Sequence, residues 1–430
     1  MPFGKASSPC SPPRCTFSTS SKKPAPKERP LFMVSFEQAL ELIRTHVSPL
    51  PPTRVPTLQA LRLPLAEPIH APVGWPRFDN SAVDGYAVRA SDCPGSLRVV
   101  RESKAGPSDT ARSLGPGEAS RIFTGAEVPP GADAVVMQED VARSSDWIEI
   151  GDAPPLGANI RKANEEFRQG DLLLESGTLI SPATIGLLAS LGFESVPVRP
   201  WPRVAIVTTG DEVRPLGETL LPGEIYESNS AMLAAALHLL GVPVTFQRAV
   251  IDQPDLTRSA LAEALVSADV VLSTGGVSVG DHDVVRAAFA SLGFEEVFWR
   301  VAIKPGKPVY FGRSLSEEGP KYALGLPGNP VSAAVGFLLF GKAILRRLLN
   351  RPIEGNTFRA SWREPTRPSD RTEFVRVQCT ETEHGWRAVP LKGQGSHMLL
   401  GLAQAGGLAR IDPKSLPDEV EVIALDWGTL

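Results

Sequence analysis

Four short stretches of the 430-residue sequence follow apolar runs and combine glycine with hydroxyl, acidic or basic side chains. They occupy residues 208–212 (TTGDE), 274–283 (TGGVSVGDHD), 304–307 (KPGK) and 326–332 (LPGNPVS). Glycines allow backbone N–H groups to approach phosphate oxygens closely, and a helix start carries partial positive charge. Residues 329–332 supply such a helix start, and Lys304 and Lys307 add full positive charges. These stretches are therefore suited to an anionic, phosphorylated small molecule.

Acidic residues in the same stretches, Glu212, Asp281 and Asp283, offer hard oxygen ligands of the kind that Mg²⁺ prefers. A single glycine-rich loop is usually only a turn, so the prediction depends on several such loops meeting. Residues 275–280 do not form a GxGxxG pattern, and no Walker A loop occurs, which disfavours dinucleotides and ordinary nucleoside triphosphates. Asp252 is as well explained by a turn or a helix start as by a site.

Strands and helices alternate between residues 201 and 351, and this order decides where the polar stretches lie. Strands are predicted at residues 204–208, 244–250, 270–273, 297–303, 309–311 and 322–326. Helices are predicted at residues 231–240, 255–266, 284–292 and 331–349. The alternation predicts a doubly wound α/β domain with a mostly parallel sheet covered on both faces. In such folds ligands bind outside the carboxyl ends of the strands, which is where the polar stretches fall.

The rest of the chain predicts smaller units around that domain. Residues 1–33 are rich in proline, serine and lysine and predict a disordered tail. A helix is expected from residue 36, with Ser35 as its cap and Gln38 completing a capping box. Short apolar runs between glycine- and proline-rich turns predict a β-rich insertion over residues 72–155. Residues 352–430 lack a long helix and predict a small β-barrel or sandwich.

Composition excludes several classes of function. The formal net charge is 44 − 48 = −4, so no broad basic surface is expected and nucleic acid is not a predicted partner. The longest apolar stretch, residues 331–340, is too short to span a bilayer, and no membrane association is expected. No CxxC pair occurs among Cys10, Cys15, Cys93 and Cys379, which disfavours a disulfide framework or a structural zinc. A cytoplasmic location is the default expectation.

Eight strings in order carry a family resemblance from about residue 34 to the end of the chain. They are FDNSAVDGYAV, TGAEVPPGADAVV, TTGDE, STGGVSVGDHD, AIKPGKP, LPGNPVS, RTEFVR and QGSH. Together they resemble the molybdopterin molybdenumtransferase family (MoeA), which includes the corresponding domain of gephyrin. Any one string is weak, whereas eight in order are specific.

The resemblance implies a four-part fold. It consists of a split elongated domain (residues 34–71 and 156–200), the insertion at 72–155, a molybdopterin-binding α/β domain at 201–351 and a C-terminal β-barrel at 352–430. It further implies a homodimer whose site lies between the α/β domain of one subunit and the insertion of the other. The implied reaction inserts molybdenum from molybdate into adenylylated molybdopterin, with Mg²⁺ present and AMP released. Transient contacts with a molybdopterin adenylyltransferase and with molybdoenzymes are also implied.

The resemblance carries roles over to matching positions. The implied catalytic acids are Asp84, Glu212, Asp252 and Asp283, of which Glu212 and Asp283 are the expected Mg²⁺ ligands. Asp252 could be a ligand or could position water. The implied substrate- and molybdate-binding residues are Thr124, Gly210, Gly275, Gly276, Ser278, Lys304, Lys307, Pro327, Gly328, Asn329, Pro330, Ser332, Arg371, Arg376 and Ser396.

The chain departs from the family pattern in three places. Asn164 and Glu166 stand where a glycine and an aspartate are usual, Arg300 stands where some members have lysine, and Gly393 replaces a histidine. Two other functions are considered: a molybdopterin adenylyltransferase using Mg-ATP, and a scaffold without enzymatic activity. The insertion and the C-terminal domain argue against the first, and the retained set of cations and acids argues against the second.

Overall fold

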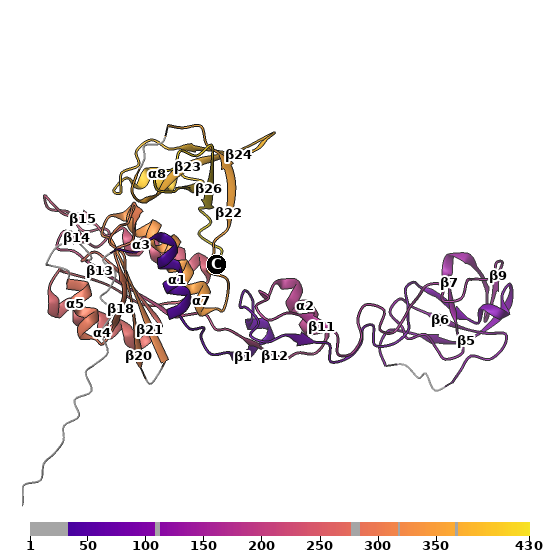
Figure 1. Ribbon diagram of the computed structural model, residues 1–430. Helices are drawn as coiled ribbons and strands as arrows, with labels where there is room; N and C mark the ends of the chain where they lie inside the picture. The colour runs from indigo at the N-terminus through magenta and orange to yellow at the C-terminus, as the bar shows by residue number, and fades with distance from the viewer. Residues whose placement is uncertain (1–32, 108–111, 277–283, 317–318, 366–368) are drawn as a thin grey trace, which may run out of the picture.

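The computed structural model describes residues 33–107, 112–276, 284–316, 319–365 and 369–430, and it has an elongated shape (Figure 1). The α/β domain and the C-terminal domain lie together at one end, and the β-rich insertion lies at the other. A small unit between them contains β1 (Thr53–Pro56) paired with β12 (Ser195–Val198), and helix α2 (Pro182–Ser190). The tail predicted for residues 1–33 lies, apart from Met33, outside the described residues.

A six-stranded sheet forms the centre of the α/β domain. Its order is β16 (Val244–Val250), β13 (Val204–Thr209), β17 (Val270–Thr274), β21 (Gly319–Leu326), β20 (Tyr310–Ser316) and β18 (Glu295–Trp299). The first four strands are parallel, and β20 runs antiparallel to both of its neighbours. The predicted α/β fold with a mostly parallel sheet is confirmed. The prediction of a strand over residues 297–303 is wrong at its end, because β18 stops at Trp299 and Arg300 takes a left-handed conformation (φ 69°).

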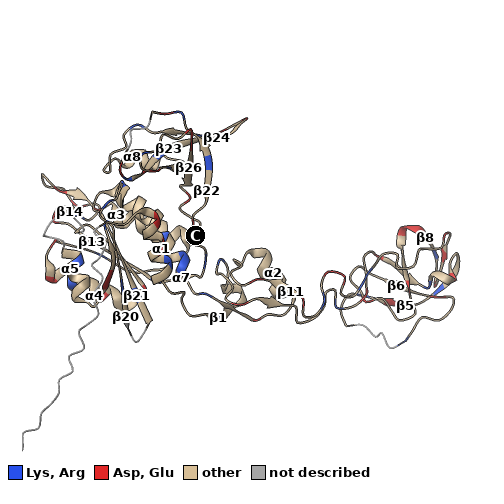
Figure 2. Cartoon of the chain, viewed as in Figure 1, with Lys and Arg blue, Asp and Glu red and all other residues tan. Residues whose placement is uncertain are grey.

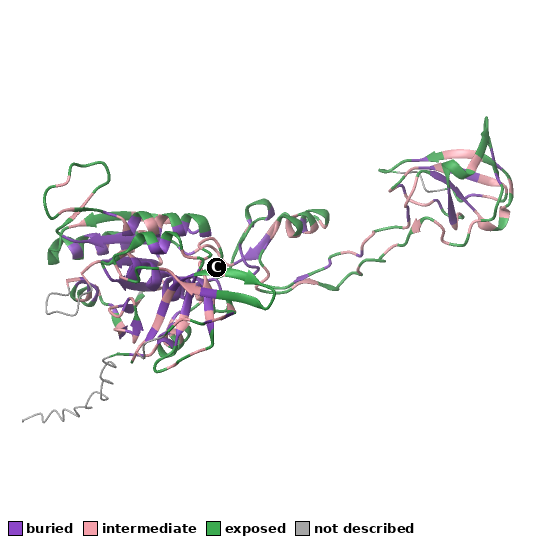
Figure 3. Cartoon of the chain, turned by 90° about the horizontal axis from the view of Figure 1, so that it is seen from above, coloured by how far each residue is buried: buried purple, intermediate pink, exposed green. Residues whose placement is uncertain are grey.

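Alternating residues of β13 explain why helices cover both faces of this sheet. Val204 and Ile206 pack in one buried cluster with α3 (Asn229–Leu240), and Ala205 and Val207 pack in a second cluster with α4 (Pro254–Ser267). Figure 3 shows many residues at the centre of this domain in the buried colour, in agreement with the full burial of β13. The chain leaves β13 through α3 to reach β16, then passes through α4 to reach β17 on the other side of β13. The direction in which successive strands are added to the sheet therefore reverses at β13. This reversal leaves a crevice at the carboxyl ends of β13 and β17.

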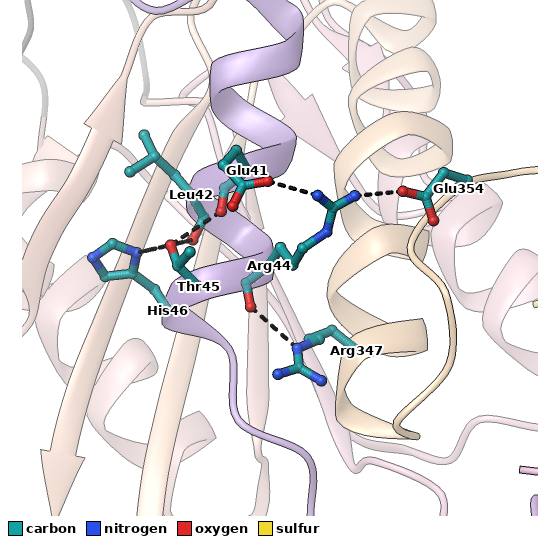
Figure 4. Close-up of polar contacts among 7 residues, drawn as sticks. All are labelled: Glu41, Leu42, Arg44, Thr45, His46, Arg347 and Glu354. Carbon is teal, nitrogen blue, oxygen red and sulfur yellow. Dashed lines mark hydrogen bonds and ion pairs between the residues drawn. The ribbon is translucent and has the colours of Figure 1, made fainter.

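Helix α1 (Phe36–His46) begins with the predicted capping box. Gln38 N–H donates to Ser35 Oγ at 3.1 Å, and Ser35 N–H donates to Gln38 Oε1 at 2.9 Å. The apolar face of α1 packs into the core of the α/β domain. On the other face, Arg44 pairs with two carboxylates, and its carbonyl accepts from Arg347 Nε at 3.1 Å (Figure 4). The helix thus joins the α/β domain, although it precedes the insertion in the chain.

The long closing helix predicted at residues 331–349 is built in three parts. Helix α6 (Pro330–Gly336) passes through a π-helical turn, Phe337–Gly341, into α7 (Lys342–Leu348). Basic side chains concentrate on α7, as Figure 2 marks. Among the described residues, no helix combines the length and apolar character needed to cross a membrane.

The other two domains are built from mixed, mainly antiparallel sheets with few helices. The insertion holds six strands in the order β7–β4–β6–β5–β9–β8, with bounds Ala134–Met137, Gly85–Val88, Glu118–Ile122, Gly95–Ser103, Trp147–Ile150 and Val141–Ser144. In the C-terminal domain the barrel strands are β22 (Thr357–Ser361), β23 (Thr372–Thr382), β24 (Gly385–Pro390), β25 (Gly407–Ile411) and β26 (Glu419–Ala424). Because β23 pairs with β25 as well as β24, the sheet closes, and the barrel alternative is confirmed.

Candidate functional site

A cleft of about 620 Å³ opens at the carboxyl edge of the α/β sheet. It is bounded by the segments that follow β13, β16, β17 and β21 and by the start of α3. Nine residues predicted from the sequence line it: Gly210, Glu212, Asp252, Gly275, Gly276, Pro327, Gly328, Asn329 and Pro330. Loops far apart in the sequence thus meet in one place, as the strand order requires. Ser278 and Asp283, together with Asp281, lie outside the described residues.

Two glycines allow neighbouring loops to approach closely. Gly275 has φ 85°, and a Cβ added there would lie 2.1 Å from the carbonyl oxygen of Thr209 at the end of β13. A Cβ added to Gly328 would lie 3.6 Å from Gly275 Cα, so the loops after β17 and β21 run against each other. Bare backbone therefore forms this part of the cleft wall, which leaves N–H groups within reach of a ligand.

The floor of the cleft is a buried polar network. Glu227 accepts hydrogen bonds from Ser230 N–H (2.8 Å), from the Ser230 hydroxyl and from Thr208 Oγ1 (3.3 Å). Asn229 donates through Nδ2 to the carbonyl of Gly328 at 2.8 Å, which ties the start of α3 to the loop after β21. The other amide atom, Asn229 Oδ1, is buried and has no hydrogen-bond partner among the described residues. The network holds two cleft walls in fixed positions.

Sequence reasoning missed the segment Tyr226-Glu227-Ser228-Asn229, all of which lines the cleft, because a helix was expected only from residue 231. The available signal was a run of polar residues directly before an apolar helix that follows a strand. Such a run is usually interpreted as helix capping, yet Ser228 makes no capping hydrogen bond through its side chain.

The residues that line the described part of the cleft include acidic side chains and no basic ones apart from histidine. Glu212, Glu227 and Asp252 line it, His397 reaches it from the C-terminal domain, and no lysine or arginine is among the lining residues that the structure describes. A phosphorylated ligand in this cleft therefore requires a cation.

The donors in the cleft can be compared with what Mg²⁺ requires. Glu212 and Asp252 provide carboxylates in the same cleft, and Mg²⁺ usually binds one or two carboxylates together with waters and phosphate oxygens. These residues fit a magnesium ion held jointly with a phosphorylated ligand. Within the described ranges, no three His, Cys, Asp or Glu side chains lie close enough together to hold a metal ion. The described residues therefore do not form a metal site that the protein alone could complete, without oxygens from a ligand.

A second group of predicted residues gathers where the α/β domain meets the barrel. Residues Ile303–Lys304 form strand β19, which pairs with Thr372 and Glu373 of the barrel, so Lys304 lies in a strand and not in the loop that we predicted for residues 304–307. Lys304 Nζ contacts Glu373 Oε1 at 3.0 Å, and Arg371 Nη1 donates to the carbonyl of Ile303 at 3.3 Å. Two cations therefore flank one strand pair.

The start of α6 connects this cationic group with the cleft. Pro330 lines the cleft, while Val331 N–H of the same turn donates to the carbonyl of Ser396 at 3.0 Å. A Cβ added to Gly306 would lie 3.5 Å from the carbonyl of Ser332, which brings the segment carrying Lys304 and Lys307 to the same helix. The cleft and the cationic group are therefore neighbours.

Arg376 is placed differently from the other predicted cations. It is 1% exposed, and its guanidinium donates to the carbonyls of Gly393 (2.7 Å), Gly395 (3.1 Å) and Met398 (3.4 Å). Burial lowers the pKa of Arg376. The side chain thus holds the segment that carries Ser396, with its charge directed at the backbone.

Asp84 and Thr124 form a pair in the insertion. Asp84 Oδ1 accepts from Thr124 N–H and from Thr124 Oγ1, each at 2.8 Å, and these bonds lower the pKa of Asp84. The insertion, which carries both residues, lies at the opposite end of the molecule from the α/β domain that contains the cleft (Figure 1). Within one chain, Asp84 and Thr124 are therefore separated from the predicted residues at the cleft and in the cationic group.

The family-deviating residues Asn164 and Glu166 lie in the connection between the insertion and the middle unit. Asn164 has a left-handed φ of 62°, and its Oδ1 lies 1.6 Å from the position that a Cβ on Gly74 would take. Glu166 N–H donates to the carbonyl of Trp75 at 3.0 Å, and Glu166 is exposed. Arg300 has its guanidinium over the ring of Trp299, 3.8 Å from the centroid.

The doubly wound sheet, the glycine-lined cleft and the adjoining cations are the features that a domain for a phosphorylated anionic molecule requires. Family models match three regions: "MoeA N-terminal region (domain I and II)" over residues 34–192, "Probable molybdopterin binding domain" over 205–347 and "MoeA C-terminal region (domain IV)" over 363–424. The chain belongs to the MoeA family.

Individual relatives agree with that assignment. A Mycobacterium tuberculosis protein named molybdopterin molybdenumtransferase 2 is 37% identical over 388 residues, covering 87% of this chain and 93% of the relative. A Nostoc protein named molybdopterin molybdenumtransferase is 40% identical over 373 residues, covering 80% and 81%. The crystal structure of a molybdopterin biosynthesis MoeA protein from Pyrococcus horikoshii matches with a TM-score of 0.75 at 32% identity, covering 91% of this chain and 99% of that one.

Replacing Gly275 by alanine tests the close approach in the cleft wall. Gly293 in the same domain has a similar φ (82° against 85°), but nothing lies within 4 Å of an added Cβ there. Both substitutions incur the cost of a left-handed alanine, about 1 kcal/mol. We expect Gly275→Ala to reduce the free energy of unfolding by roughly 1–3 kcal/mol more than Gly293→Ala, measured by chemical denaturation. Equal losses would contradict the contact with Thr209.

Proposed function

We propose that this chain is a molybdopterin molybdenumtransferase, which transfers molybdenum from molybdate to adenylylated molybdopterin and releases AMP. The observation that carries the proposal is the adjacency of two anion sites across the start of α6. The glycine-lined cleft suits the phosphates of the adenylylated substrate, and the Lys304–Arg371 group beside it suits a molybdate dianion. Membership of the MoeA family supports the same assignment.

The reaction has two balanced parts. Water cleaves the phosphoric anhydride, so that one phosphate remains on molybdopterin and the other leaves as AMP. The two dithiolene thiolates displace one oxygen of molybdate, which takes up two protons and leaves as water. Lys304 and Arg371 hold the dianion next to the thiolates, and the hydroxyls of Ser332 and Ser396 are the proposed neutral donors to it.

The acids on the cleft wall act at the phosphates in this proposal. Glu212 and Asp252 are the proposed ligands of Mg²⁺ within the described residues, with Asp283 as a further candidate outside them. Magnesium, when bound, neutralises charge on the phosphates and stabilises the leaving oxygen. Backbone N–H groups of Gly276 and of the loop at Gly328 contribute hydrogen bonds to the phosphate oxygens, whereas the Gly275 N–H already donates to the carbonyl of Leu326 at 3.2 Å.

We further propose that the site is completed by a second subunit. The insertion that carries the Asp84–Thr124 pair lies at the other end of the molecule from the α/β domain with the cleft (Figure 1), which supports a homodimer in which the insertion of one subunit reaches the cleft of the other. The proposal includes a cytoplasmic location. It also includes transient contacts with the adenylyltransferase that supplies the substrate and with the molybdoenzymes that receive the product.

Molybdate-dependent release of AMP from adenylylated molybdopterin, measured with Mg²⁺ present, tests the reaction, and Lys304→Ala tests the molybdate site. Removing one charge-assisted contact should raise the molybdate concentration needed for half-maximal release roughly ten-fold or more. The fold should persist, because the Lys304 side chain is 55% exposed.

Arg203→Ala provides a matched control for that variant. Arg203 is 49% exposed and also pairs with a carboxylate, Asp269, at 2.8 Å, but it precedes β13 and does not line the cleft at the carboxyl edge of the sheet. It should leave the molybdate dependence unchanged. Unfolding of Lys304→Ala, an equal effect of both variants, or no AMP release from the wild type would contradict the proposal.

Mixing two variants, assayed at a molybdate concentration too low for Lys304→Ala to react, tests the shared site. Asp84→Asn removes a residue of the insertion and Lys304→Ala removes one of the cationic group beside the cleft, so each homodimer alone should be inactive in this assay. If the residues act across subunits, a mixed dimer has one doubly substituted site and one intact site. Re-equilibrated mixtures should then recover about a quarter of wild-type AMP release, as half the dimers are mixed. No recovery, with mixed dimers shown by mass spectrometry, would contradict the shared site.

A further inference from the structure

The side chain of Tyr226 presents an aromatic ring at the cleft that the proposed reaction does not use. Tyr226 lines the cleft and is 44% exposed. Among the described residues, no other aromatic ring and no cation stacks on it. A large apolar face is therefore left open on the wall of a binding cleft.

The ring is held in place before any ligand binds. Its hydroxyl donates to the carbonyl of Glu218 at 2.8 Å. Its strand β15 (Ile225–Tyr226) pairs with β14 (Val213–Arg214), and Arg214 forms an ion pair with Glu224 at 2.7 Å. A ring fixed at its far end loses little conformational freedom on binding, which favours stacking.

The ring is also connected to the two parts of the cleft already assigned. Ile225 N–H donates to the carbonyl of Glu212 at 2.9 Å, so the strand that carries Tyr226 is bonded to the proposed Mg²⁺ ligand. On the C-terminal side of Tyr226, the chain continues to Glu227 and Asn229, which belong to the buried polar network of the cleft. A flat group beside Tyr226 would therefore have acidic and amide groups at its edge, and the phosphates of the same molecule would extend toward Glu212.

We propose that Tyr226 is a stacking platform for a nitrogen heterocycle of the substrate and thereby a specificity-determining residue. This inference rests on the proposed function, in which the substrate contains two such heterocycles, the pterin and the adenine. Stacking on an aromatic side chain depends on the flat face of the ligand and tolerates either ring.

Binding of separate halves of the substrate to the full-length chain tests the inference by titration calorimetry. The probes are AMP, molybdopterin and ribose 5-phosphate, which keeps the phosphate and lacks the base. The variants are Tyr226→Leu, which keeps apolar bulk without the ring, and Tyr226→Phe, which keeps the ring without the hydroxyl. Leu221→Ala is the matched control, because Leu221 is 65% exposed on the same β14–β15 connection but does not line the cleft.

We expect Tyr226→Leu to weaken binding of AMP or of molybdopterin at least about five-fold. Whichever probe is weakened identifies the heterocycle that stacks. Tyr226→Phe should bind within about two-fold of wild type, and ribose 5-phosphate should not distinguish Tyr226→Leu from wild type. Leu221→Ala should leave all three probes unchanged.

Two results would overturn the inference while leaving the proposed function in place. One is unchanged binding of both AMP and molybdopterin to Tyr226→Leu. The other is an equal loss for ribose 5-phosphate or for Leu221→Ala, which would indicate a general disturbance of the cleft wall. A wild-type protein that binds neither AMP nor molybdopterin would overturn the proposed function and the inference together.

Discussion

Reversal of strand order at β13 is the constraint on which the site depends. The chain passes from β13 through α3 to β16, and then from β16 through α4 to β17 on the other side of β13, so the segments after β13 and β17 lie on opposite faces of the sheet. The cleft occupies the space between them. Glycine at position 275 then permits the loop after β17 to lie against the end of β13, which a side chain would prevent. The cleft therefore has backbone for part of its wall, and this suits phosphate oxygens.

The second constraint is that the barrel is joined to the α/β domain by a strand pair. Because β19 belongs to the α/β segment of the chain yet pairs with β23, Lys304 is fixed beside Arg371 of the barrel. Arg376 adds to this arrangement from within the barrel by holding the segment at Ser396, whose carbonyl accepts from the start of α6. The anion site proposed for molybdate thus depends on docking between domains. The cleft is formed mainly by loops at the edge of the sheet, with His397 added from the C-terminal domain.

The sequence predicted the parts of the site that follow from local pattern. The β-branched runs and the glycine-rich stretches after them placed Gly210, Gly275 and Gly328 at one edge of a sheet, since the carboxyl ends of parallel strands lie together. The capping box at Ser35 was likewise a local property. The position of Lys304 was not predictable, because β19 pairs with residues far along the chain. The strand predicted at residues 297–303 was continued past its true end at Trp299, because the left-handed conformation of Arg300 has no reliable local signal.

Hydrogen–deuterium exchange tests most directly whether the crevice at β13 and the cationic group beside it are separate, adjoining anion sites. AMP should slow exchange in residues 208–213, 226–230 and 326–331, whose backbone surrounds the cleft. Molybdate should slow exchange in residues 303–307, 371–373 and 395–397, where the barrel meets the α/β domain. Protection by AMP confined to the barrel or the insertion, or the same pattern with both ligands, would contradict the account.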